Sequence, residues 1–267
     1  MSTPAPLPRE SVKSSVERQF SQVAANYSSS AVHASGVELL HMIQAAELAS
    51  SERVLDAGCG AGHTALAFAP HVAEVVAMDL SESMLAQVRL LAQERDIHNI
   101  VYQRGDVENI PFDDGEFDLV VSRYSAHHWP EPQRALNEIQ RVLRGNAGRR
   151  GQLILADIVS SDNFTVDTYI QAIEVLRDPS HVRDHTVAQW LAMLSGAGFN
   201  GELVYEWALW LDYTSWVNRM QTPPAVVETI RALMDTAPSE VRDALKIEED
   251  HSFTLFGAVL RGTFGRG

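Results

Sequence analysis

Three alternating glycines that follow a short apolar run constrain the fold more than any other feature of this sequence. Residues 53–64 begin as an apolar strand that ends at Asp56, continue through Gly58, Gly60 and Gly62, and then enter a helix-forming run. Glycine permits the positive φ of a sharp turn and lets a ligand approach the backbone closely. The segment therefore predicts a strand, a ligand-binding turn and a helix.

The spacing of these glycines argues against a dinucleotide. A dinucleotide loop has the form G-x-G-x-x-G and holds a pyrophosphate at the start of its helix. Here the pattern is G-x-G-x-G, and the carboxylate of Asp56 at its start would repel a phosphate. That carboxylate suits the ammonium of an amino-acid group, which makes a dinucleotide-dependent oxidoreductase the weaker alternative.

Two more aspartates follow the next two apolar runs. Asp79 ends the run 72–78, where a carboxylate can hold both hydroxyls of a ribose. Asp106 follows the run 100–104, where it can accept a hydrogen bond from an exocyclic amine such as that of adenine. The predicted ligand thus combines an amino acid, a ribose and an adenine.

At this point the sequence resembles the class I S-adenosylmethionine-dependent methyltransferases. The resemblance rests on four motifs in order, at 54–62, 78–79, 105–107 and 117–122, and extends from about Phe20 to Phe199. It is strongest to the small-molecule branch that includes the ubiquinone and menaquinone C-methyltransferases. The cofactor it implies is S-adenosyl-L-methionine, and the cofactor-binding positions are Asp56, Gly58, Cys59, Gly60, Asp79, Leu80, Asp106, Val107 and Ser122.

Strands and helices alternate along the chain, which predicts an α/β fold with a doubly wound, seven-stranded, mostly parallel sheet of the Rossmann-like methyltransferase type. We expect a tail and lid helices at 1–49 and an α/β core at 50–212 with a lid segment at 160–185. A helical insertion at 213–249 and a last strand with its tail at 250–267 follow. The ligand should lie where the strands end.

Candidates for catalysis lie in the loop after the fourth strand. His127 or His128 could remove a proton from a hydroxyl or an activated carbon, since histidine titrates near neutral pH. The alternative is that one histidine orients the loop and the other packs. Tyr27 could face the methyl group or only pack the lid against the sheet, and Asp157, after the fifth strand, is a second base or a cap.

Three further residues are candidates for holding the acceptor. Trp129 belongs to the histidine loop, and Arg177 with His181 could bind an anionic or phenolic group. The alternative for the last two is a capped turn with solvated charges. We expect no metal site, because His181 and His185 have no evident third ligand.

Composition limits the partners. A net charge of −14 has the wrong sign for gripping a phosphate backbone, so we expect no nucleic-acid substrate. The single cysteine, Cys59, forms no intramolecular disulfide, and no segment has the form of a signal peptide or a membrane span. We expect a cytoplasmic protein. The apolar stripe of 213–246 either roofs the active site or forms a homodimer.

The predicted function is methyl transfer from S-adenosylmethionine to a small, hydrophobic or ring-containing acceptor, at carbon or oxygen. The alternative is a cofactor-binding regulatory or assembly module without catalysis, because binding residues alone do not establish turnover.

Overall fold

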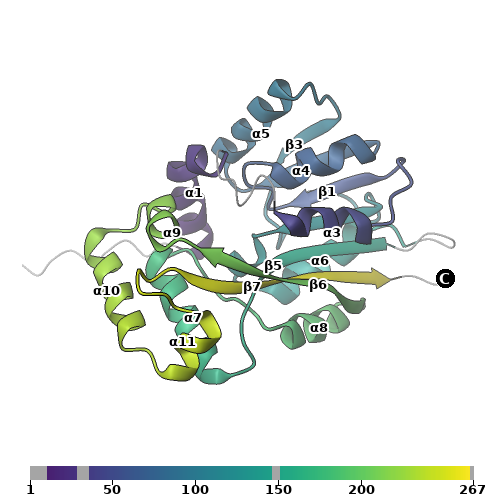
Figure 1. Cartoon of the computed structure of the whole chain (residues 1–267). Coiled ribbons are helices and arrows are strands. Elements are labelled where there is room, and N and C mark those ends of the chain that lie inside the picture. Colours follow the sequence, from purple (N-terminus) through teal and green to yellow (C-terminus); the bar gives the residue numbers. More distant parts are fainter. Residues whose placement is uncertain (1–10, 29–35, 146–150, 265–267) are drawn as a thin grey trace, which may run out of the picture.

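The computed structural model describes residues 11–28, 36–145 and 151–264, with the side chains of 22–28 outside the described part. Its sheet has seven strands within these ranges, in the order β3-β2-β1-β4-β5-β7-β6 (Figure 1). The strands are β1 (Arg53–Ala57), β2 (Glu74–Asp79), β3 (Ile100–Arg104), β4 (Leu119–Arg123), β5 (Gly151–Val159), β6 (Asn200–Leu211) and β7 (Phe253–Phe264). The first five are parallel, and β7 is antiparallel to both of its neighbours, which confirms the predicted doubly wound fold.

Some of the helices begin where the sequence supplies a capping side chain. Ser81 accepts a hydrogen bond from the N–H of Met84 and caps α5, and Thr186 forms a capping box with Gln189 at the start of α8. The described helices are α1 (Val12–Ser28), α3 (Val37–Ala45), α4 (His63–Phe68), α5 (Glu82–Glu94), α6 (Pro132–Val142), α7 (Phe164–Arg177), α8 (Val187–Gly196), α9 (Tyr213–Arg219), α10 (Pro224–Asp235) and α11 (Ser239–Leu245), with short 3₁₀ turns at η1 (Ala69–His71) and η2 (Ala126–His128).

The two faces of the sheet form separate cores because side chains alternate along each strand. Val54 and Val75 point to the face that α3, α4 and α5 cover. Leu55 and Val76 point to the opposite face, under α6 and α8. Burial on both faces explains why β1 and β2 are apolar almost throughout.

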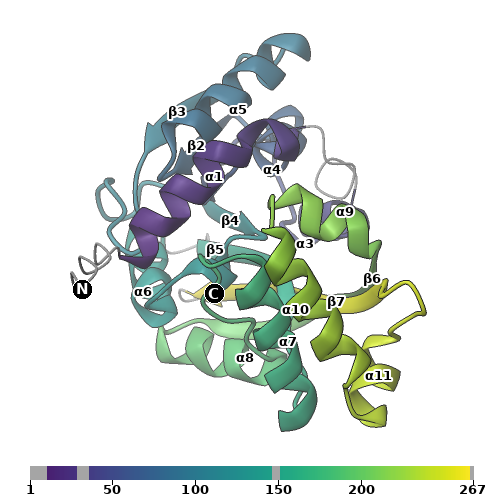
Figure 2. The same cartoon turned by 90° about the vertical axis from the view of Figure 1, so that its left-hand side faces the viewer.

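The position of β1 in the sheet creates the site. β1 lies between β2 and β4, so that Leu55 pairs with Val76 on one side and with Val120 on the other. Chain order therefore reverses at β1, and the loops after β1 and β4 diverge to leave a crevice. In Figures 1 and 2, α1 and α9 to α11 lie at this edge, where the parallel strands end.

Several boundaries differ from those that the sequence pattern predicts, which are a first helix ending at Phe20, a fourth strand beginning at Phe117 and a last strand ending at Arg261. The fourth strand begins at Leu119 and not at Phe117, because Phe117 makes only an isolated bridge to Leu143 before its ring enters the core. The first helix continues past Phe20 to Ser28. The last strand extends to Phe264 because it pairs with β5 along that whole length.

The helical insertion packs on its own chain. Proline breaks it into separate helices, with Pro224 opening α10 and Pro238 preceding α11. Its apolar side chains, Trp216, Ile230 and Met234 among them, form one buried cluster with α7. The stripe is thus used within the chain, and a homodimer through 213–246 stays a prediction.

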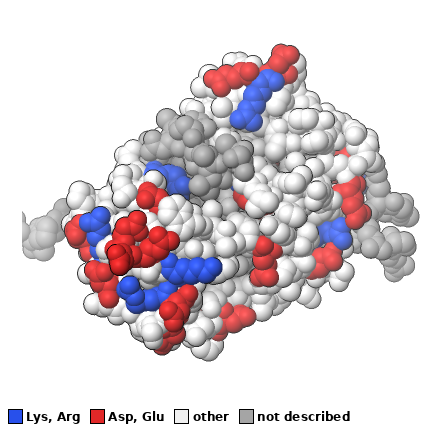
Figure 3. Space-filling view, viewed as in Figure 1, with Lys and Arg blue, Asp and Glu red and all other residues white. Residues whose placement is uncertain are grey.

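Within the described residues, no helix has the length and apolar character needed to cross a membrane. On the face shown in Figure 3, the basic side chains of the described residues lie among acidic ones and form no extended basic surface. That distribution agrees with the acidic composition of the chain.

Candidate active site

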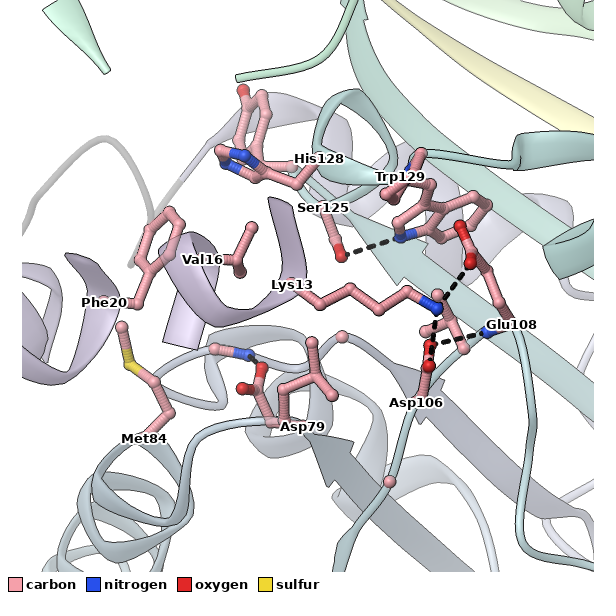
Figure 4. Close-up of a pocket in the computed structure, with 17 residues that line it drawn as sticks. Lys13, Val16, Phe20, Asp79, Met84, Asp106, Glu108, Ser125, His128 and Trp129 are labelled. Atoms are coloured by element: carbon pink, nitrogen blue, oxygen red, sulfur yellow. Dashed lines mark hydrogen bonds and ion pairs between the residues drawn. The ribbon is translucent and has the colours of Figure 1, made fainter. Parts of the chain in front are cut away.

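A cavity of about 650 Å³, here called the glycine cavity, lies at the carboxyl ends of β1 and β2 (Figure 4). It brings together predicted cofactor residues from three separate loops: Gly58, Gly60, Asp79, Leu80, Asp106 and Val107. Cys59 instead lines a smaller cavity of about 440 Å³ beside the same glycine turn. Burial and the neighbouring carboxylates raise the pKa of the Cys59 thiol well above its usual value, which makes it a poor nucleophile.

The three glycines are needed for different reasons. A Cβ on Gly58 would lie 2.1 Å from Oγ of Ser125, and one on Gly62 would lie 2.5 Å from Cγ1 of Val88. A Cβ on Gly60 would meet no atom within 4 Å, although its φ of +51° is also in the left-handed region. Gly58 and Gly62 therefore allow close packing, whereas Gly60 leaves open space that a ligand can fill.

Asp79 connects the glycine turn to the end of β2. Its Oδ2 accepts the backbone N–H of Gly60 at 2.9 Å, and its Oδ1 accepts that of Ser81 at 2.8 Å. Burial raises the pKa of the Asp79 carboxyl above its usual value. Each carboxylate oxygen retains acceptor capacity, so the pair can still receive two hydroxyl groups from a ligand.

Asp106 and Glu108 form an acidic pair on the other side of the glycine cavity. The N–H of Glu108 donates to Oδ1 of Asp106 at 2.9 Å. Lys13 of α1 crosses to this pair, with its Nζ 2.6 Å from Oδ2 of Asp106 and 2.5 Å from Oε2 of Glu108 (Figure 4).

Asp56 and Ser122, two further predicted cofactor residues, are buried and do not line the glycine cavity. The carboxylate oxygens of Asp56 have no hydrogen bond of good geometry among the described residues, although the backbone N–H of Ala65 lies close enough to lower the pKa of the carboxyl. Burial, with a contribution from Asp79, raises the pKa of Asp56 to about 7. Ser122 donates to the carbonyl of Ala57 at 2.7 Å and so supports the end of β1.

A second cavity of about 560 Å³, here called the histidine cavity, adjoins the first. Phe20, Tyr124 and His128 line both cavities, so these three side chains form the boundary between them. The apolar part of its wall consists of Ile158, Leu209, Leu211, Trp216 and Leu255. The polar part includes His127.

His127 and Asp157 form a buried pair. Nδ1 of His127 donates to Oδ1 of Asp157 at 2.7 Å, which leaves Nε2 as the ring nitrogen available to a ligand. Burial alone lowers the pKa of His127, but the carboxylates of Asp157, Asp184 and Glu174 together outweigh this effect and raise the pKa to about 9. Asp157 itself does not line either cavity, so it acts on His127 and not directly on a ligand.

The surroundings of His128 favour the neutral form of its ring, in contrast to those of His127. Its Nδ1 donates to the carbonyl of Ser180 at 3.1 Å, and its ring packs against Phe20 at 5.0 Å between centroids. Burial and the adjacent His127 lower the pKa of His128 to about 4. The two histidines thus separate into a charged one held by a carboxylate and a neutral one held by a carbonyl.

The predicted acceptor residues divide between the cavities. Trp129 lines the glycine cavity and donates to Oγ of Ser125 at 3.3 Å. Arg177 lines the histidine cavity, where it pairs with Glu174 and donates to the carbonyl of Trp216.

His181 and Tyr27 complete the set. His181 is buried and does not line the histidine cavity, but its ring lies 5.7 Å from that of His127. The side chain of Tyr27 lies outside the described residues. Among the described residues, no three His, Cys, Asp or Glu side chains are grouped as metal ligands.

The structure also brings in residues that the sequence analysis missed. Tyr124, which lines both cavities, has a φ of +52° and donates its hydroxyl to Glu38 of α3 at 3.0 Å. Asp184 lines the histidine cavity, and its buried Oδ2 makes no hydrogen bond with the described residues but lies 4.0 Å from Nε2 of His181. A positive φ at a tyrosine has no sequence signal, whereas the density of polar residues around Asp184 was visible.

Comparison with known proteins identifies the fold and the chemistry. Residues 55–148 match the model of a methyltransferase domain family. YcgJ, a methyltransferase of Bacillus subtilis (strain 168), is 36% identical over 251 residues, which cover 92% of this chain and 98% of YcgJ. Its crystal structure superimposes with a TM-score of 0.80 over 86% of this chain and 98% of that one.

Two other relatives cover less of the chain. YafE of Escherichia coli (strain K12) is 39% identical over 74% of this chain and 93% of YafE. A demethylmenaquinone methyltransferase of Staphylococcus saprophyticus is 34% identical over 36% of this chain and 41% of that protein. The chain therefore belongs to the S-adenosylmethionine-dependent methyltransferases, in the family that includes YcgJ.

Proposed function

We propose that this methyltransferase binds S-adenosylmethionine in the glycine cavity and methylates a small, ring-containing acceptor in the histidine cavity. The observation that carries the proposal is the shared boundary of the two cavities, formed by Phe20, Tyr124 and His128. Two ligands that fill adjoining cavities can meet at this boundary, which is what direct transfer requires.

The glycine cavity fits the cofactor. Asp79 suits the two ribose hydroxyls, and Asp106 with Val107 suits the adenine. The open side of Gly60 admits the ligand close to the backbone. When bound there, S-adenosylmethionine supplies an electrophilic methyl group.

The histidine cavity favours an acceptor with an apolar body and one acidic hydroxyl. Ile158, Leu209 and Leu255 provide apolar walls. As the pH approaches the raised pKa of His127, the neutral imidazole that forms can take the hydroxyl proton on Nε2, and Asp157 stabilises the imidazolium that results. The oxygen, or a ring carbon activated by it, then has the electron pair that forms the new bond to carbon.

His127 is the better candidate for this base. Its Nδ1 is held by Asp157 and its Nε2 is left for a ligand, while its raised pKa means that the neutral form, which acts as the base, increases as the pH rises toward 9. His128 has both a lowered pKa and a bond to the Ser180 carbonyl, which suits a wall residue. The similarity to a demethylmenaquinone methyltransferase supports a ring-containing acceptor.

The test is a comparison of His127→Ala with His128→Ala. Formation of S-adenosylhomocysteine is measured with a panel of phenols and quinols, and binding of S-adenosylhomocysteine is measured by calorimetry. We expect His127→Ala to lower turnover by about 100-fold or more, the usual contribution of a general base, with little change in cofactor affinity. Equal turnover in the wild type and His127→Ala would remove His127 from the reaction.

A further inference from the structure

A lysine from the N-terminal helix occupies part of the glycine cavity. Figure 4 shows the Lys13 side chain running from α1 across the middle of the cavity, between Asp79 and Ser125, to the acidic pair at the far side. Val16 and Phe20 of the same helix also line the cavity. Helix α1 therefore forms part of the cavity wall and also places the side chain of Lys13 inside the cavity.

The chemistry at the end of this side chain resembles what an adenine would offer. Backbone N–H groups already satisfy the inner oxygens of the acidic pair, since Glu108 donates to Oδ1 of Asp106 and Glu131 donates to Oε1 of Glu108 at 2.7 Å. The remaining oxygens, Oδ2 and Oε2, receive the ammonium of Lys13. An exocyclic amine is also an N–H donor and needs the same acceptors.

We propose that Lys13 is an intramolecular competitor of the cofactor, and that α1 is a strap whose lysine must leave Asp106 before an S-adenosyl ligand binds. The inference rests on the nucleotide site of the proposed function, because it requires the adenine to lie at Asp106. It adds a residue that sets the affinity and rate of cofactor entry.

The energetics suit a contact that opens. The side chains of Lys13 and Asp106 are 32% and 26% exposed, so water can replace this contact at modest cost, whereas Glu108, at 2% exposed, needs another donor when Lys13 leaves. Burial lowers the pKa of Lys13, but the hydrogen bonds to Asp106 and Glu108 outweigh this and raise it, so the side chain is charged at neutral pH. A second ion pair, Arg104 with Glu17 at 2.7 Å, holds α1 from outside the cavity.

Opening of the strap also affects the second cavity. Phe20 lies on α1 and forms part of the boundary between the two cavities. Displacement of the helix by the cofactor therefore reshapes the wall that the acceptor meets. This coupling favours entry of the cofactor before the acceptor.

The experiment is calorimetric titration of the full chain with S-adenosylhomocysteine. Lys13→Met is compared with the wild type and with Lys246→Met, which removes the chain's other lysine at the end of α11, far along the chain from the cavity. We expect Lys13→Met to bind about fivefold more tightly, the size of a partly exposed ion pair, and Lys246→Met to match the wild type. Equal affinity of Lys13→Met and the wild type overturns the proposal, and weaker binding shows that Lys13 holds the nucleotide instead.

A second measurement uses the wild type alone, so that buried Glu108 keeps Lys13 as its ion-pair partner. Salt screens ion pairs, so raising the salt concentration should strengthen binding of the net-neutral S-adenosylhomocysteine to the wild type. Affinity that falls or stays constant with salt contradicts the proposal. Asp79→Ala separates the two claims: if it leaves binding intact, the nucleotide site is wrong, and if it weakens binding while Lys13→Met has no effect, only the strap is wrong.

Discussion

The imidazole and the backbone N–H of His127 both donate to the carboxylate of Asp157, at 2.7 Å to Oδ1 and 3.1 Å to Oδ2. The two contacts fix the loop after β4 to the end of β5 and fix which ring nitrogen carries a proton. They also leave Nε2 as the ring nitrogen that can meet a ligand in the histidine cavity. Asp157 is thus a positioning residue for the candidate base.

Asp157→Asn should lower the pKa of His127 from about 9 toward its free value of 6.5, because burial is then opposed only by the carboxylates of Asp184 and Glu174. A pKa raised in the folded state stabilises the fold fully below pH 6.5, and this contribution disappears as the pH rises to 9. The wild type should lose at most about 3.5 kcal/mol of unfolding free energy over that window from this group, and the variant should lose less.

Histidine ring resonances followed by NMR titration check the pKa, and urea unfolding at the two ends of the window checks the stability. Asp235→Asn is the matched control, since it removes a carboxylate 2.8 Å from Nε2 of His251 at the surface. An unchanged His127 titration in Asp157→Asn would contradict the assigned electrostatics.

The pairing of His127 with Asp157 also shows where prediction from the sequence ends. Both residues were predicted as separate base candidates, because each follows an apolar strand. Their contact depends on the parallel register of β4 and β5, in which Arg123 lies opposite Ala156. That register is a long-range property, and the local pattern does not contain it.

For the cofactor-binding residues, too, the sequence predicts the strand-end positions but not the contacts that depend on packing. Asp79 and Asp106 could be predicted because each stands at the end of its own strand, and the carboxyl ends of parallel strands meet at one edge. Lys13 could not, since it lies 93 positions from Asp106 and reaches it only through the docking of α1. Nor could the burial of Asp56 behind the cavity wall, which depends on how the turn closes over it.

Gly60→Ala and Gly62→Ala should separate ligand binding from stability. Both variants place an alanine at positive φ, which costs about 1–2 kcal/mol. The Gly62 variant adds a contact at 2.5 Å with Val88, so it should have the lower melting temperature. The Gly60 variant directs its methyl group into open space and should instead weaken S-adenosylhomocysteine binding by about tenfold or more, or about 1.4 kcal/mol. Thermal melts and calorimetry on the pair test this, and a Gly60 variant with wild-type affinity would place the ligand elsewhere.

Asp79→Ala should weaken binding of S-adenosylhomocysteine about 10- to 150-fold, since a hydrogen bond to a charged group contributes about 1.5–3 kcal/mol. Part of the effect comes from the turn, because Asp79 also accepts the N–H groups of Gly60 and Ser81. Asp79→Asn is the graded control, because its amide oxygen can keep one of these bonds without the charge. Calorimetry that finds Asp79→Ala unchanged would remove Asp79 from the site.

Asp56→Asn should raise the free energy of unfolding at high pH and weaken binding of the ligand. The pKa of Asp56 is raised from 3.8 to about 7 in the folded protein, so the neutral form is the one that the fold favours. The wild type therefore loses stability from this group as the pH rises from about 4 to 7, by less than about 4 kcal/mol. The variant has no such charge, and it should exceed the wild type in unfolding free energy at pH 8 but not at pH 4.

Affinity should change in the opposite direction. If the Asp56 carboxylate meets the ammonium of S-adenosylmethionine, the neutral amide binds it less well, and the Kd rises at pH 8, where the wild-type group is ionised. Asp96→Asn, at an exposed position after α5, is the control and should alter neither quantity. A variant that is less stable than the wild type at pH 8 would mean that a donor of the chain already satisfies this carboxylate, and an unchanged Kd would exclude it from the ligand site.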